Sequence, residues 1–152
     1  AITNPLHDYA KEKAFINAAG KGDIDAVRIY IDGHINIDAD NDLGTTAIIA
    51  ASKNRHIVIV QLLISLDADV NARDNNGWSS LSYAAFNNDE LTTLVLLNSG
   101  ARVNNEDADK RTTLDRAVLA GHTNIVRLVL THNAEVGNAL ELAKEKNKKE
   151  WE

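Results

Sequence analysis

The sequence predicts an all-α repeat solenoid, because one pattern of apolar residues recurs through the chain at an interval of 33 positions. A fixed period of about 33 residues is typical of arrays in which each unit buries its apolar face on the next. Four columns keep this interval without a gap: Ala18, Ala51, Ala84 and Ala117; Ile37, Val70, Val103 and Val136; Phe15, Ile48, Leu81 and Leu114; and Ile31, Ile64, Leu97 and Leu130.

The period divides the chain into units of one domain, residues 1–152. We expect a cap with repeat one (1–40), repeat two (41–73), repeat three (74–106), repeat four (107–137) and a closing helix (138–152). Such an array needs no central core, so a hydrophobic content of 44% is sufficient.

Composition restricts the partners that we expect. The chain has 22 acidic and 16 basic residues and a formal charge of −6, which disfavours nucleic acid. It contains no apolar run long enough to span a membrane and no recognisable targeting segment. Without cysteine, it can form neither disulfides nor thiolate metal sites. We expect a cytoplasmic location. Because the sequence contains no methionine, a mature periplasmic or secreted chain is the alternative.

Repeat one is expected to differ from the others at its start. Asn4 and Pro5 suit the beginning of a helix, and the helix is predicted over 6–19. Lys11, Glu12 and Lys13 stand where later repeats have their turn, so this unit should replace its hairpin with a longer helix. A second helix is predicted over 24–31, with its inward side formed by Val27, Ile29, Tyr30 and Ile31.

Repeat two shows the unit most clearly. Gly44 ends a polar turn and is free to adopt a positive φ, and Thr46 can cap the helix over 47–53. A second helix is predicted over 57–65, because Val60, Leu63 and Ile64 form one apolar stripe.

Repeats three and four follow the same plan. Helices are predicted over 80–87, 90–98, 113–120 and 125–132. After Val136 the period breaks, and the first-helix pattern arrives about seven residues early, at Leu140 to Ala143. A polar closing helix is therefore predicted from 138 to about 149.

These motifs resemble the ankyrin-repeat family over nearly the whole chain. The matching positions are Gly44, Thr46, Ile48, Ala51, His56, Ile59, Val60, Leu62, Leu63, Ala68, Asp69, Val70 and Asn71 in repeat two, Gly77, Leu81, Ala84, Leu96, Leu97, Gly100, Ala101, Val103 and Asn104 in repeat three, and Thr112, Leu114, Ala117, Gly121, His122, Ile125, Val126, Leu128 and Ala134 in repeat four.

The sequence departs from the family pattern at two columns. The family proline is replaced by Ala47, Ser80 and Thr113, and the family histidine that follows it by Ile49, Ser82 and Asp115. We expect these replacements to weaken the first helical turns and the contacts between hairpins. They predict an array less stable than one with the consensus sequence.

The resemblance implies that the protein binds another protein through a concave face formed by the hairpin tips and the first helices. The predicted partner-binding residues are Leu43, Thr45, Lys53, Asn75, Asn76, Trp78, Phe86, Asn87, Asp109, Arg111 and Leu119. Two interpretations of Trp78 are open at this point. It either packs flat on the neighbouring hairpin, or forms with Phe86 an exposed aromatic centre of the kind that dominates binding energies.

Acidic residues follow the same hairpin edge and predict a partner with a basic surface. They are Asp38, Asp40, Asp42, Asp74, Glu106, Asp107 and Asp109. Some of them are also explained as turn formers, since aspartate bonds its own backbone.

Residues for chemistry are not apparent. The five histidines do not cluster as a metal site requires, and no catalytic constellation or phosphate loop is present, so we expect no cofactor and no enzyme activity. The predicted function is a monomeric interaction module. The alternative is a dedicated inhibitor or immunity-type protein that caps an enzyme. Asn71 and Asn104 resemble the family position that is hydroxylated in animal cells.

Overall fold

The structure is a computed structural model that describes residues 5–151. Over this range the chain forms nine α-helices joined by turns and extended loops. They are α1 (Pro5–Lys21), α2 (Ile24–Asp32), α3 (Ala47–Lys53), α4 (Ile57–Ser65), α5 (Ser80–Phe86), α6 (Glu90–Asn98), α7 (Thr113–Ala120), α8 (Thr123–Thr131) and α9 (Ala139–Trp151).

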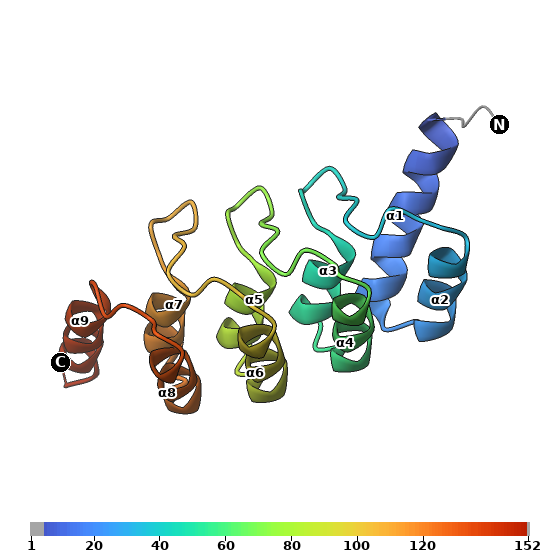
Figure 1. The fold of residues 1–152 in the computed structure, drawn as a ribbon. Helices are drawn as coiled ribbons and strands as arrows, with labels where there is room; N and C mark the ends of the chain where they lie inside the picture. Colours follow the sequence, from blue (N-terminus) through green and yellow to red (C-terminus); the bar gives the residue numbers. More distant parts are fainter. Residues whose placement is uncertain (1–4, 152) are drawn as a thin grey trace.

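The helices stand in two rows, as the sequence period predicts (Figure 1). The first row is α1, α3, α5, α7 and α9, each packed on the next, and the second row contains α4, α6 and α8 in the same relation. Each later pair of helices is preceded by a hairpin loop that projects to one side of the rows (Figure 1). Isolated β-bridges close two of these loops, Asp40 to Thr46 and Arg73 to Ser79.

The apolar columns form the interface between successive units. Phe15, Ile48, Leu81 and Leu114 are all buried, and so is the alanine column that lets the first-row helices approach closely. Burying each layer on the next is therefore what holds the array together, and the prediction of an all-α repeat solenoid is confirmed.

Repeat one does have the long helix that its sequence predicts. Helix α1 has 17 residues, and its N-terminal turns rise to the level of the hairpin loops (Figure 1). There the Tyr9 hydroxyl donates a hydrogen bond to the Asp42 carboxylate, and the Lys13 ammonium lies 4.9 Å from the centre of the Tyr9 ring. The start of α1 thus covers the loop of repeat two in place of a hairpin of its own. Asn4, predicted to cap this helix, lies outside the described residues.

Several helix bounds differ from the predicted ranges by one or two residues, as in α8, which begins at Thr123 rather than Ile125, and α9 (Ala139–Trp151) lies within the predicted closing segment 138–152. One detail of the prediction is wrong. Ile29, predicted to face inward, is 69% exposed. Its columns in later repeats, Leu62 and Val95, are half-buried. No second-row helix precedes α2 in the described range, so nothing there covers Ile29.

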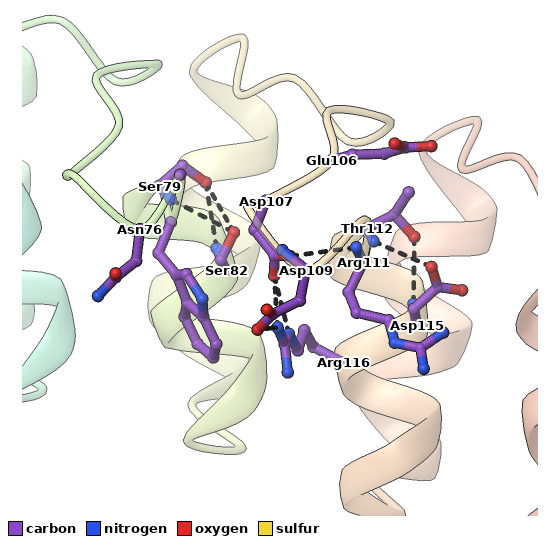
Figure 2. A network of polar contacts seen from close by, with 12 residues as sticks. Asn76, Ser79, Ser82, Glu106, Asp107, Asp109, Arg111, Thr112, Asp115 and Arg116 are labelled. Atoms are coloured by element: carbon purple, nitrogen blue, oxygen red, sulfur yellow. Dashed lines mark hydrogen bonds and ion pairs between the residues drawn. The ribbon is translucent and has the colours of Figure 1, made fainter.

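The departures from the family pattern are partly compensated. Ser82 and Asp115, which replace the family histidine, form capping boxes with Ser79 and Thr112: each side chain accepts the backbone N–H of the N-cap residue (Figure 2). A capping box satisfies two helix-terminal donors at once. In repeat two, Ile49 has no such group, and only the Thr46 hydroxyl caps the helix.

Carbonyl groups in the last turns of the first-row helices are tied to the next layer. Helix ends leave carbonyl oxygens without a partner inside the helix, and here side chains from the following unit supply one. The pairs are Asn54 Nδ2 to Gly20 O (2.9 Å), Asn87 Nδ2 to Lys53 O (2.8 Å), His122 Nε2 and Phe86 O (2.9 Å), and Lys146 Nζ to Leu119 O (3.3 Å).

Candidate functional site

The predicted concave face corresponds to one surface of the structure, formed by the hairpin tips and the neighbouring exposed positions of the first-row helices, and we keep that name for it. Hydrogen bonds between tips hold its edge in place. The Asn75 backbone N–H donates to Leu43 O at 3.0 Å, its side-chain amide donates to Asp42 O at 3.0 Å, and the Ala108 N–H donates to Asn76 O at 3.0 Å. The three tips are therefore spaced by direct backbone contacts, and this edge is ordered before any partner binds.

An aromatic cluster occupies the middle of this face. The ring centre of Trp78 lies 4.9 Å from that of Tyr83 and 5.5 Å from that of Phe86, which meets it edge-on. The Arg116 guanidinium lies 4.7 Å from the Trp78 ring centre. Trp78 is consequently half-buried, with part of its surface used in packing, whereas Phe86 is 47% exposed.

Asp74 fixes this cluster from the hairpin side. Its carboxylate accepts the backbone N–H groups of Asn76 and Trp78, both at 3.0 Å, and the hydroxyl of Tyr83. Burial, together with the contact to Asp74, raises the pKa of Tyr83 above its ordinary value, because a phenolate would lie in a half-buried site beside a carboxylate. Tyr83 therefore stays neutral and donates to Asp74, which in turn holds the backbone at Trp78.

Asp107 plays the corresponding part in repeat four. It accepts the N–H groups of Asp109 and Arg111, and its carboxylate oxygen lies 2.8 Å from an Arg116 guanidinium nitrogen (Figure 2). The Asp107 side chain is only 3% exposed. The same guanidinium also pairs with Asp109 at 3.1 Å. The predicted row of free carboxylates is thus shortened, since Asp74 and Asp107 face inward.

The other predicted binding residues fall into two groups. Leu43, Lys53, Asn76 and Leu119 are exposed on the face, and Lys53 places its ammonium 5.5 Å from the centre of the Tyr83 ring. Thr45, Asn87 and Arg111 are half-buried, and the amides of Asn75 and Asn87 are used to tie neighbouring units. Asn71 and Asn104 are engaged in a similar way: each Oδ1 accepts a backbone N–H of the following repeat.

One feature was missed from the sequence. A hollow of about 340 Å³ lies between α1 and α3 at the hairpin of repeat two, and its lining residues are Ile16, Asn17, Gly20, Lys21, Asn41, Leu43, Thr45, Ala50, Lys53 and Asn54. The column of Ala50 also contains Asn17, Tyr83 and Arg116, so Ala50 is its smallest member. That size difference is the signal in the sequence that could have indicated a hollow.

The described residues form neither a metal-binding cluster nor a membrane-spanning helix. No three His, Asp or Glu side chains among them gather in a way that could hold a metal ion. Within the same residues, no helix combines the length and apolarity needed to cross a membrane.

Comparison with known proteins decides the family. The family model described as ankyrin repeats (3 copies) matches residues 15–107 and 74–140, most of the chain. The chain belongs to the ankyrin-repeat family. Ankyrin repeats are generally protein–protein interaction modules and typically non-catalytic.

Similar ankyrin-repeat proteins come from bacteria and animals. YahD of Escherichia coli K12, named as an ankyrin repeat protein, is 29% identical over 118 residues, 78% of this chain and 59% of YahD. Mouse ankyrin repeat and SAM domain-containing protein 6 is 31% identical over 99 residues, 63% of this chain and 11% of that protein. Human neurogenic locus notch homolog protein 2 is 40% identical over 72 residues, which are 47% of this chain and 3% of that protein. This ankyrin chain spans less than two thirds of each relative.

Proposed function

We propose that this ankyrin chain is a non-catalytic interaction module that holds a folded partner protein on its concave face. The observation that carries the proposal is the aromatic cluster of Trp78, Tyr83 and Phe86, whose backbone is fixed by Asp74. Exposed apolar side chains extend it on both sides, Leu43 at 69% and Leu119 at 39% exposure. Exposed apolar surface of this kind marks interaction sites.

Preorganisation makes this cluster suited to binding. Trp78 is already packed between Phe86 and Arg116, so little side-chain entropy is lost when a partner covers it. Aromatic anchors surrounded by well-packed neighbours supply most of the energy in typical interfaces. A face of this length could support a standard interface of roughly 1,600 Å² in total.

The charges at the tips favour a partner that is basic where it meets the hairpins. Asp40, Asp42 and Glu106 are exposed, as is Asp109, whose charge is shared with Arg116. Exposed carboxylates act mainly on the association rate and much less on the affinity. We propose that the protein is a monomer before this encounter.

The test compares two matched pairs of variants in pull-downs from the native host's extract. Phe86→Ala with Leu119→Ala removes two exposed side chains of the concave face. Val58→Ala with Leu91→Ala removes two side chains of the second row that are 61% and 68% exposed. We expect the concave pair to lose the partner, by at least about ten-fold in retained amount, and the second-row pair to keep it.

Circular dichroism first establishes that both variants are folded. The opposite pattern, with the partner lost only from the second-row pair, would place the interface on the other side of the array. The inhibitor alternative is decided with the captured partner. If it is an enzyme, its activity should vanish at a one-to-one ratio for an inhibitor and persist for an adaptor.

A further inference from the structure

The hollow between α1 and α3 exists because repeat two lacks a contact that repeats three and four make. In those repeats the turn aspartate reaches the first-helix residue nine positions later, Asp74 to Tyr83 and Asp107 to Arg116. The corresponding pair in repeat two is Asn41 and Ala50. The Asn41 Oδ1 accepts only the N–H groups of Leu43 and Thr45 in its own turn, and the alanine methyl reaches nothing above it. The space occupied elsewhere by a phenol or guanidinium is open here.

The lining of this hollow is cationic. Lys21, at the end of α1, and Lys53, at the end of α3, both line it, and both are exposed. No carboxylate is among the lining residues. The acidic residues on either side of Asn41, Asp40 and Asp42, are exposed but do not line the hollow.

The rest of the lining is suited to a short side chain with a charged end. Ile16, Gly20 and Ala50 contribute apolar lining, and the side chains of Asn17 and Thr45 contribute polar groups. Leu43 stands beside the hollow and is 69% exposed. A carboxylate side chain could lay its methylene groups on these apolar residues and pair with Lys21, and with Lys53 once its ammonium turns from the Tyr83 ring, because charged hydrogen bonds between lysine and carboxylate are strong.

We propose that this hollow is an anion subsite of the concave face: it takes an aspartate or glutamate side chain of the partner, next to an apolar residue that packs on Leu43. The proposal rests on the proposed function and specifies the partner further. The partner surface should be basic where it meets the exposed tip carboxylates and should carry an acidic residue that reaches the first-row helices at α1 and α3.

The test is a titration of the ¹⁵N-labelled chain, followed by two-dimensional NMR, with two synthetic peptides. Both are twelve residues long, capped at each end and share one central leucine, but one carries four glutamates and the other four glutamines. We expect the glutamate peptide to shift the amide signals of Gly20, Ala50 and Lys53 in a saturable way that weakens as salt is added. The glutamine peptide should leave these signals in place.

Two variants and one matched control locate the subsite. Ala50→Tyr copies the residue of repeat three and should fill the hollow, and Lys21→Gln with Lys53→Gln removes both charges. Each should lower the affinity for the glutamate peptide about ten-fold, the lysine pair because two ion pairs are lost and Ala50→Tyr because the space is filled. Arg28→Gln with Arg127→Gln removes two exposed charges of the second row and should leave the affinity unchanged.

Three results would overturn the proposal. They are equal binding of both peptides, absence of shifts around the hollow at millimolar peptide, and an equal loss in the second-row control, which would indicate attraction to net charge alone. If Ala50→Tyr does not fold, the lysine pair decides. Failure here is distinguishable from failure of the proposed function. A partner lost by the Phe86 and Leu119 variant but retained by the Lys21 and Lys53 variant would leave the concave face in use without an anion subsite.

Discussion

Asp74 and Asp107 belong to a residue type that either offers a free carboxylate to a partner or holds a turn, and the sequence does not show which. The sequence pattern predicts carboxylates along the hairpin edge, and the structure places both residues there. Each, however, accepts two backbone N–H groups of its turn and reaches a helix residue nine positions later. Turn formation could be inferred from the local sequence, whereas the partner on the helix depends on how the hairpin folds back over it.

The hydrogen bond from Tyr83 to Asp74 can be tested through the pH dependence of the free energy of unfolding. Its pKa is raised above 10.0 in the folded chain, so the folded state holds the phenolic proton more tightly than the unfolded chain does. The stabilisation is complete below about pH 10 and is lost as the pH rises towards the raised pKa. The free energy of unfolding, measured with urea at pH 7, 9, 10 and 11, should therefore fall steeply above pH 10.

Tyr83→Phe should flatten that fall and cost about 1 kcal/mol at pH 7 through loss of the hydrogen bond to Asp74. An identical slope above pH 10 in the variant and the wild type would mean that the pKa of Tyr83 is not raised in the folded chain.

Lys110 has a left-handed backbone conformation at a position where two other repeats have glycine. Gly44, Gly77 and Lys110 share one column and have φ values of 75°, 76° and 63°. The left-handed region costs a residue with a Cβ about 1–2 kcal/mol, part of which is offset because glycine is more flexible in the unfolded chain. Lys110→Gly should therefore raise the free energy of unfolding by about 0.5–1 kcal/mol.

A lysine-to-glycine change in a helix is the control. Lys144→Gly, in α9, should lower the same free energy by about 1 kcal/mol, because glycine is a poor helix former. A loss of stability in Lys110→Gly as large as that in Lys144→Gly would contradict the strain argument.

At the scale of elements, the helices themselves were largely predictable. The bounds of α3, α4, α6 and α7 match the sequence-based ranges, because side-chain caps mark the starts of α3, α6 and α7 and the apolar stripe marks α4. The start of α8 was missed because Thr123 and Asn124 are polar and carry no part of the apolar stripe. Exposure of Ile29 could not be read from periodicity either, since it depends on which helix lies beyond the first layer.

Helix α6 places two threonine hydroxyl groups in the apolar core. Thr92 and Thr93 are fully buried, and neither hydroxyl has a hydrogen-bond partner. Their columns hold Ile59 and Ile125, and Val60 and Val126, in the neighbouring repeats. A buried hydroxyl without a partner costs about 1–3 kcal/mol. The second helix of repeat three therefore places two hydroxyl groups without partners where repeats two and four have apolar side chains.

Thr93→Val replaces that hydroxyl with a methyl group of nearly the same size. We expect the free energy of unfolding to rise by about 1 kcal/mol, measured by urea denaturation. Thr123→Val, at an exposed position in α8, should change it by less than about 0.5 kcal/mol. A decrease in the Thr93 variant would show that the hydroxyl is satisfied in solution.

At the scale of the whole molecule, the sequence period was sufficient to predict the fold. Each layer contacts only its neighbours, so four aligned columns define the packing without any knowledge of distant contacts. The family pattern indicated correctly that Leu43, Lys53, Phe86 and Leu119 are exposed, whereas the binding role of this surface stays a prediction. The chemistry of the surface was not predictable, since the covering of Trp78 by Arg116 and the hollow at Ala50 both arise from contacts between a hairpin and a helix.

The central claim is that the partner lies on the concave face, and photo-crosslinking tests it most directly. A benzophenone amino acid replaces Phe86 on that face in one variant and Leu91 of the second row, which is more exposed, in another. After irradiation in the native host's extract, we expect one crosslinked protein from the Phe86 position and none from the Leu91 position. A crosslink from Leu91 alone would contradict the claim and place the partner on the opposite side of the array.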